Sequence, residues 1–405
     1  MPIFVFRMDS KNYFINHLAQ TSPFPIGIEV QSAEGNWITD TSGKRYLDFI
    51  SGVGVTNMGH RHPKVVEAIH AQAEKYLHVM VYGEFIQQPL HDLAEELQHI
   101  LPKYLDNYYF VNSGAEATEA ALKLAKRVTG RSELVAMKGA YHGNTHGALS
   151  VSANEKKKYR FRPLLPDVRF LKYNSIPDLD QITERTAGVI LESVQGDAGV
   201  IVPSTEYMQA LAAKCKSVGA LLMVDEIQCG MGRTGKPFAF SHFGIEPDVI
   251  IMGKALGGGL PIGAIAAPKK HMELFSHDPI LGHITTFGGN PLICASAAAF
   301  LKAMRTEIDW NEVEEKSELI TQFLNHEAIS EVRKIGLMYA ADLQSFDEVK
   351  WLFDFCLERG LITFWFLSTD YAFRLAPPLT VTKEEIEWTG KIIREGLDQI
   401  LSRRT

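Results

Sequence analysis

Residues 220–259, ALLMVDEIQCGMGRTGKPFAFSHFGIEPDVIIMGKALGGG, decide the fold. Two apolar runs in this stretch, 220–224 and 249–252, have the length and composition of buried parallel strands, and they end at or near the charged residues Asp225 and Lys254. Ligands of open α/β sheets bind beyond the carboxyl ends of the strands. The pattern therefore predicts an acid and a lysine facing one crevice, although a lysine before AlaLeuGlyGlyGly can also lie in a solvated turn.

These two groups suit the chemistry of pyridoxal phosphate. A lysine at the end of a buried strand is partly desolvated, which favours the neutral amine that attacks a carbonyl. Pyridoxal phosphate needs a Schiff-base lysine, a carboxylate for its pyridinium nitrogen and an anion site for its phosphate. Lys254 and Asp225 can supply the first two.

The motifs VDEIQCGMGRTG (224–235) and PDVIIMGKALGGGLPIGA (247–264) resemble the core of the class III aminotransferases, which are fold-type I pyridoxal-phosphate enzymes. The resemblance implies an α/β fold with a mostly parallel central sheet, helices on both faces and a smaller α+β domain. Residues 51–305 are expected to form the large cofactor-binding domain. Residues 1–50 and 306–405 are expected to join as the small domain.

A third motif, NSGAEATEAALKLAKR, begins at Asn112 and resembles the family's phosphate-binding segment, which assigns Ser113, Gly114 and Ala115 to the phosphate. The pattern also predicts a strand that leads into a helix here. Unpaired N–H groups and the helix dipole favour an anion at such a junction. Ordinary helix capping by Asn112 or Ser113 is the alternative.

Further cofactor contacts are implied by the resemblance. The family covers one face of the pyridine with an aromatic ring, and Tyr141, followed by His142, stands at that position. Gln228 matches the glutamine near the cofactor's phenolic oxygen, and Glu192 ends another buried strand. Thr286 matches the residue that reaches the phosphate of the neighbouring subunit, which implies a homodimer with shared sites.

The expected substrate pocket departs from the family pattern. Asn144 replaces the arginine that usually holds a carboxylate, and asparagine offers neither its charge nor its bidentate fork. Asp197 replaces the glutamate that pairs reversibly with a distal arginine, although a turn residue is the alternative. Arg374 matches the α-carboxylate arginine. Val53 replaces the tyrosine of ornithine aminotransferases, which favours N-acylornithine, 4-aminobutyrate or a diamine, and Ser193 replaces a usual proline.

The implied activity is transamination from an ω-amine or amino acid to a keto acid, with 2-oxoglutarate as the expected acceptor. Lys254 would hold the cofactor and move the proton, and Asp225 would keep the ring nitrogen protonated. An aminomutase, a decarboxylase or a pyruvate-dependent aminotransferase of the same fold are alternatives. A non-catalytic binding protein is a further one, against which the presence of Lys254, Asp225 and Gln228 argues.

Composition and local pattern set further expectations. A chain of 405 residues that is 46% hydrophobic can build a large core, and a net charge of −7 argues against nucleic-acid binding. The four cysteines lack CxxC spacing, and His60 and His62 lack a third ligand, so neither disulfides nor a metal site is expected. Without a long apolar segment the chain is expected to be cytoplasmic.

The pattern also predicts short strands within 21–50 and a helix that begins at Pro63. Residues 332–343, VRKIGLMYAADL, resemble the central strand of the family's small domain, so one strand is expected there, and the charged residues at 312–317 predict a solvated helix face.

Overall fold

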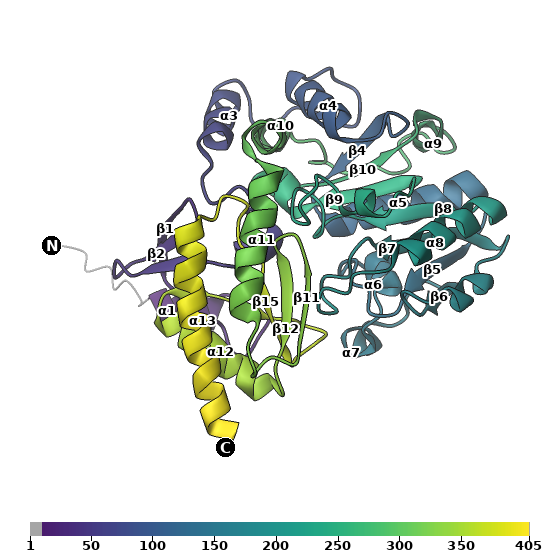
Figure 1. Ribbon diagram of the computed structural model, residues 1–405. Coiled ribbons are helices and arrows are strands. Elements are labelled where there is room, and N and C mark those ends of the chain that lie inside the picture. The colour runs from purple at the N-terminus through teal and green to yellow at the C-terminus, as the bar shows by residue number, and fades with distance from the viewer. Residues whose placement is uncertain (1–9, 405) are drawn as a thin grey trace.

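The computed structural model describes residues 10–404 and is built around a seven-stranded sheet (Figure 1). Five neighbouring strands of this sheet are parallel, whereas β10 is antiparallel to both of its neighbours, β9 and β4. The mostly parallel sheet agrees with the prediction. In spatial order the strands are β4 (Asn107–Val111), β10 (Gly263–Ala267), β9 (Val249–Gly253), β8 (Leu221–Asp225), β7 (Thr186–Glu192), β5 (Glu133–Met137) and β6 (Val168–Leu171).

Alternate residues of these strands enter two separate apolar clusters, one on each face of the sheet. In β8, for example, Leu222 and Val224 belong to one cluster, and Leu221 and Met223 belong to the other. Helix α8 (Thr205–Val218) contributes to the first cluster, and helix α5 (Gly114–Thr129) contributes to the second. Both faces are therefore covered, which explains why every residue of β8 and β9 is buried.

Three helices pack together beside the β4 edge of the sheet (Figure 1): α3 (Pro63–Ala73), α4 (Gln88–Ile100) and α10 (Pro291–Glu307). Helix α3 begins at Pro63, as predicted, because proline is pre-organised for the first helical position.

Two four-stranded sheets lie on the other side of the molecule (Figure 1). One has the order β1 (Val30–Glu34), β2 (Trp37–Asp40), β3 (Arg45–Asp48) and β13 (Leu361–Ile362), and the other has the order β11 (Glu331–Ile335), β12 (Met338–Asp342), β15 (Ala372–Leu375) and β14 (Phe364–Trp365). Because β3 pairs with β13, the chain before residue 50 and the chain after residue 305 share a sheet. The domain bounds stated above stay a prediction.

Helix α12 (Phe346–Glu358) packs against both smaller sheets, and helix α13 (Lys383–Arg404) packs against α12 and α11 (Trp310–Leu324). Helix α11 exposes Glu312, Glu314 and Glu315, as the predicted solvated face requires. Lys316 differs, because it is buried and its Nζ donates to the carbonyl of Leu379 at 3.0 Å.

The prediction of one strand within 332–343 is wrong. This segment is a hairpin in which β11 and β12 run antiparallel. The turn contains Gly336, whose φ of +52° lies in the left-handed region. A Cβ at this position would lie 2.4 Å from the carbonyl carbon of Thr234. The turn escaped notice because its single glycine is set in an almost continuous apolar run.

Short elements complete the described residues, and none of the helices between residues 10 and 404 is long and apolar enough to cross a membrane. The short helices are α1 (Ser10–His17), α2 (Ser51–Gly54), α6 (His146–Val151), α7 (Glu155–Lys158) and α9 (Lys269–Met272), and the 3₁₀ turns are η1 (Tyr159–Phe161), η2 (Pro177–Gln181), η3 (Ala239–His242), η4 (Lys254–Gly257) and η5 (Glu273–Ser276).

Candidate active site

A cavity of about 510 Å³ lies at the carboxyl edge of the parallel strands. Asp225 is the last residue of β8 and Lys254 directly follows β9, so both reach this edge. The cavity brings together most of the residues selected from the sequence: Gly114, Ala115, Tyr141, His142, Asn144, Glu192, Asp225, Gln228 and Lys254.

Lys254 opens the turn η4 with a φ of +47°. A non-glycine residue adopts this conformation at a cost of about 1–3 kcal/mol, so the surrounding structure must hold it in place. The Lys254 amine makes no hydrogen bond or ion pair with any residue between 10 and 404. Burial lowers the pKa of Lys254, while the charge of Asp225 opposes this shift and that of Arg374 adds to it. The site therefore favours the neutral amine that a carbonyl group needs as a nucleophile.

Asp225 is 3% exposed and is fixed by two donors. Its Oδ2 lies 2.6 Å from Nδ1 of His142, and its Oδ1 accepts from the N–H of Ile227 at 3.0 Å. Nε2 of His142 is buried without a partner among the described residues. The carboxylate is thus held in one orientation beside the cavity, as a group that pairs with a ring N–H⁺ has to be.

Glu192 lies next to Asp225 in the register of β7 and β8. Its two oxygens accept from the N–H groups of Tyr141 at 3.2 Å and Gly196 at 3.1 Å. Burial raises the pKa of Glu192 to about 7, and the charge of Asp225 adds to the rise while His142 opposes it. Glu192 therefore binds a proton more readily than an exposed glutamate does.

The first turn of α5 borders the cavity through Gly114 and Ala115, whose N–H groups have no acceptor within the helix. Ser113 does not line the cavity. Its Oγ accepts from the N–H of Glu116 at 3.2 Å, so it caps the helix, which was the alternative considered for this residue. A Cβ at position 114 would lie 2.7 Å from Cδ1 of Ile227, so a larger residue here would require the Ile227 side chain to shift.

Tyr141, Asn144 and Gln228 form other parts of the cavity wall. Nδ2 of Asn144 donates to the hydroxyl of Tyr141 at 3.2 Å. Burial raises the pKa of Tyr141, and the charge of Asp197 adds to this shift. Gly196 allows Gln228 its position, since a Cβ there would lie 2.3 Å from Oε1 of Gln228.

Arg374 lies on β15 and is 5% exposed, but its guanidinium has no hydrogen bond or ion pair with any described residue. Its Cζ lies 4.3 Å from the centroid of the Phe366 ring. Burial lowers the pKa of Arg374 to about 10, and the charge of Asp197 opposes the shift. A buried guanidinium without an anion partner is suited to bind the carboxylate of a substrate.

Asp197 does not pair with an arginine in the described chain. Its Oδ2 lies 3.1 Å from Nζ of Lys157 and accepts from the hydroxyl of Ser368 at 2.6 Å, and its Oδ1 accepts from the N–H of Leu367 at 3.2 Å. It therefore joins α7 to the loop before β15. It is a buried turn residue, and it does not pair with Arg374 in this conformation.

Five predicted site residues do not line the cavity: Ser113, Arg374, Asp197, Val53 and Thr286. Val53 has a φ of +65° and packs against the small cluster formed by Tyr46, Ile50 and Ile362. Thr286 is exposed in the loop before α10. The neighbouring Thr285 accepts a hydrogen bond from Asn112 at 2.7 Å.

Sequence reasoning missed three residues around the site. Lys157 was not distinguished from the lysines beside it. The hydroxyl of Ser193, noted only as a replaced proline, donates to the buried carboxylate of Glu226. Arg233, a position within the quoted motif, is 1% exposed and links Asn57 to the carbonyl of Leu337. Their partners lie far away in sequence, so no local pattern signals them.

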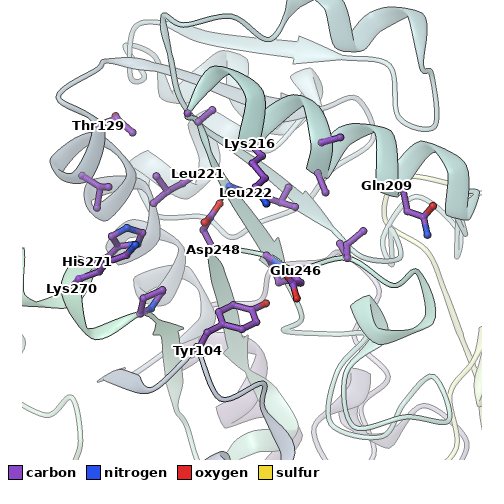
Figure 2. A pocket seen from close by; sticks show the side chains of 18 of the residues that line it. Tyr104, Thr129, Gln209, Lys216, Leu221, Leu222, Glu246, Asp248, Lys270 and His271 are labelled. Carbon is purple, nitrogen blue, oxygen red and sulfur yellow. Dashed lines mark hydrogen bonds between the residues drawn. The ribbon is translucent and has the colours of Figure 1, made fainter.

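A larger cavity, of about 1050 Å³, lies at the opposite edge of the sheet, and Figure 2 shows Tyr104, Asp248 and His271 around it. It is bordered by Leu221, the first residue of β8, whereas Asp225 at the other end of the strand borders the candidate site. Asp248 is already engaged, since it accepts from the N–H of Leu222 at 2.8 Å. This cavity is therefore remote from the lysine and the acid.

A model of the aminotransferase class-III family matches residues 19–397. This chain belongs to the class III aminotransferases. Members of this family are pyridoxal-phosphate-dependent enzymes, so the predicted family, enzyme class and cofactor are confirmed.

Proteins similar to this chain include several aminotransferases that are named for different substrates. The acetylornithine aminotransferase of Archaeoglobus fulgidus is 39% identical over 90% of this chain and 94% of its own. The [LysW]-aminoadipate semialdehyde/glutamate semialdehyde transaminase of Sulfolobus acidocaldarius is 37% identical over 92% of this chain and 96% of its own. The putrescine aminotransferase of Pectobacterium atrosepticum is 37% identical over 92% of this chain and 82% of its own.

The fold is also that of solved aminotransferases. The ornithine aminotransferase of Toxoplasma gondii superposes with a TM-score of 0.90 at 26% identity, over 98% of this chain and 97% of that one. A transaminase from the marine bacterium Virgibacillus has the same TM-score at 23% identity, over 98% of this chain and 99% of that one. At this low identity the likeness supports the fold alone.

The residues of this aminotransferase fit the cofactor of the family. The cavity combines a lysine amine without partners among residues 10–404, a buried carboxylate held by a histidine, and the first turn of a helix, which begins at Gly114. These are the amine, the acid and the anion site that pyridoxal phosphate requires.

Proposed function

We propose that this aminotransferase moves the terminal amino group of an ω-amine to a 2-oxo acid. The relatives named for acetylornithine, putrescine and semialdehyde substrates support this class of donor. Arg374 is the observation that supports a 2-oxo acid as the acceptor. It is a buried guanidinium that has no anion partner among residues 10–404, and its charge acts on Lys254. An amino acid or 2-oxo acid would place its carboxylate on Arg374.

When bound, pyridoxal phosphate supplies an aldehyde that condenses with amines and a ring that draws electrons from the adjacent carbon. Lys254 would hold this group and, once displaced by the substrate amine, would carry the proton to and from the reacting carbon. Asp225, fixed by His142, would keep a proton on the ring nitrogen. The N–H groups of Gly114 and Ala115 would bind the phosphate.

The remaining cavity residues would position these groups. Tyr141 would cover one face of the ring, and Gln228 would donate to its phenolic oxygen. Glu192, which accepts from the backbone of Tyr141, would fix the loop that carries that ring. Asn144 leaves the usual arginine position without charge, so a dicarboxylic acceptor would need another cation for its distal carboxylate, whereas pyruvate would not.

The proposal includes a homodimer in which Thr286 of the neighbouring subunit completes the phosphate site. Thr286 lies among exposed apolar side chains of two adjoining segments, 77–86 and 280–287, as the contact between the rings of His78 and Phe287 at 5.1 Å indicates. Exposed apolar patches of this kind are typical of protein interfaces. The exposed members are Leu77, Met80, Phe85, Ile86, Ile280, Leu281, Ile284 and Phe287. A cytoplasmic location stays a prediction.

The test is a series of single half-reactions. Holoenzyme is mixed separately with N-acetylornithine, ornithine, putrescine, 4-aminobutyrate, L-alanine and L-glutamate, and the absorbance of the bound cofactor is followed. We expect at least one ω-amine and at least one of the two amino acids to react with release of a carbonyl product. If no external amine yields a released carbonyl product, the enzyme is an aminomutase or decarboxylase of the same fold and the proposal is wrong.

A further inference from the structure

Lys157 places a second cation at the rim of the cavity, close to the residue that lacks the family's arginine. It lies on helix α7, and its Nζ is 5.2 Å from the centroid of the Tyr141 ring. The hydroxyl of that ring accepts a hydrogen bond from Asn144. Both Tyr141 and Asn144 line the cavity. The side chain of Lys157 is 29% exposed and does not itself line the cavity, so it reaches a bound solute only by turning away from Asp197.

The ion pair between Lys157 and Asp197 does not occupy the whole ammonium group. An ammonium has three N–H donors, and the hydrogen bond to Asp197 uses one of them. Asp197 has two further donors, the hydroxyl of Ser368 and the N–H of Leu367. If Lys157 turns toward a substrate, the buried carboxylate of Asp197 is therefore still hydrogen-bonded, which limits the cost of the movement.

We propose that Lys157 binds the distal carboxylate of a dicarboxylic amino acid and of its 2-oxo acid, in place of the arginine that is absent at position 144. This proposal rests on the proposed transamination and deepens it, because it names glutamate and its 2-oxo acid as the second substrate pair. Arg374 takes the α-carboxylate and Lys157 takes the distal one. Asp197 connects the two cations, because it pairs with Lys157 and its charge also acts on Arg374.

The geometry also distinguishes the substrates that need Lys157 from those that do not. L-Alanine has one carboxylate, which goes to Arg374, and putrescine has none. Both should react independently of Lys157. The residue should therefore affect the binding of glutamate selectively rather than the chemistry of the cofactor.

The experiment compares holoenzymes of the wild type, Lys157→Gln, Lys157→Arg and the control Lys156→Gln in half-reactions with L-glutamate, L-alanine and putrescine. Lys156 is the matched control because it is the exposed neighbour on the same short helix. We expect Lys157→Gln to raise the apparent dissociation constant of glutamate by about 10-fold or more, the effect of one charged hydrogen bond, with a smaller change in the maximal rate. Lys157→Arg should restore much of the affinity, and Lys156→Gln should behave as wild type.

Three outcomes would overturn the inference. The first is unchanged glutamate affinity in Lys157→Gln, and the second is an equal loss for L-alanine, which would indicate a structural role. The third is a wild-type enzyme that reacts with an ω-amine and L-alanine but not with glutamate, which would leave the proposed transamination intact. A wild-type enzyme that reacts with none of the amines would overturn both proposals together.

Discussion

Glu192 and Asp225 are paired in register as the last residues of the neighbouring parallel strands β7 and β8. Two acids thus end side by side at the carboxyl edge of the sheet, and they differ in their partners. Asp225 lies against a histidine, whereas Glu192 accepts only backbone N–H groups. Burial and the charge of Asp225 raise the pKa of Glu192 to about 7.

This pairing predicts how stability depends on pH. Between the ordinary glutamate pKa of 4.5 and about 7, the folded chain keeps a proton on Glu192 that the unfolded chain loses. The free energy of unfolding should therefore fall as pH rises through this range, by about 3 kcal/mol for one such group. Urea unfolding of the cofactor-free protein at several pH values measures the slope. Glu192→Gln should reduce it, and an unchanged slope in this variant would contradict the assignment.

Replacement of Lys254 by alanine should abolish turnover, because the amine that holds the cofactor and carries the proton is lost. We expect the rate to fall by about 10³-fold or more. The absorbance band of the lysine-bound cofactor should disappear while the far-UV circular dichroism stays as in the wild type. Lys302→Ala, on an exposed face of α10, is the control. Wild-type turnover in Lys254→Ala would exclude the proposed role.

Arg374→Gln should impair substrates that carry a carboxylate beside the reacting carbon. The guanidinium offers charge-assisted hydrogen bonds to a carboxylate, so kcat/KM for L-glutamate or L-alanine should fall by about 10²-fold. Putrescine has no carboxylate and should react at an almost unchanged rate. An equal loss for putrescine would show that Arg374 supports the fold of the site rather than the substrate.

Replacement of the two buried arginines should change stability by different amounts. Arg233 donates to Asn57 and to the carbonyl of Leu337, so Arg233→Met leaves buried acceptors without a donor and should cost about 3 kcal/mol or more. Arg374 has no such partners in the described chain. Arg374→Met should therefore change the free energy of unfolding by no more than about 1 kcal/mol. Chemical denaturation of the cofactor-free variants compares the two, and similar losses would contradict this difference.

Much of the fold could be predicted from local pattern. The run 220–224 overlaps strand β8 in all but its first residue, the run 249–252 lies within β9, and the helix at Pro63 begins where proline predicts it. The hairpin within 332–343 was not anticipated, because one glycine in an apolar run gave too weak a turn signal. The residues expected around Lys254 that line the cavity lie together because each ends a strand, lies in the loop after one or lies in the first turn of a helix.

The sequence by itself determined the class III family, the order of the cofactor motifs and the strand ends that carry Asp225 and Lys254, because these depend on residue type and short spacing. The tertiary structure decided which partners the buried charges have. It paired Asp197 with Lys157, joined Ser193 to Glu226 and left Arg374 without an anion. Such partners are distant in sequence, and only packing brings them within the few ångströms over which a hydrogen bond or an ion pair forms.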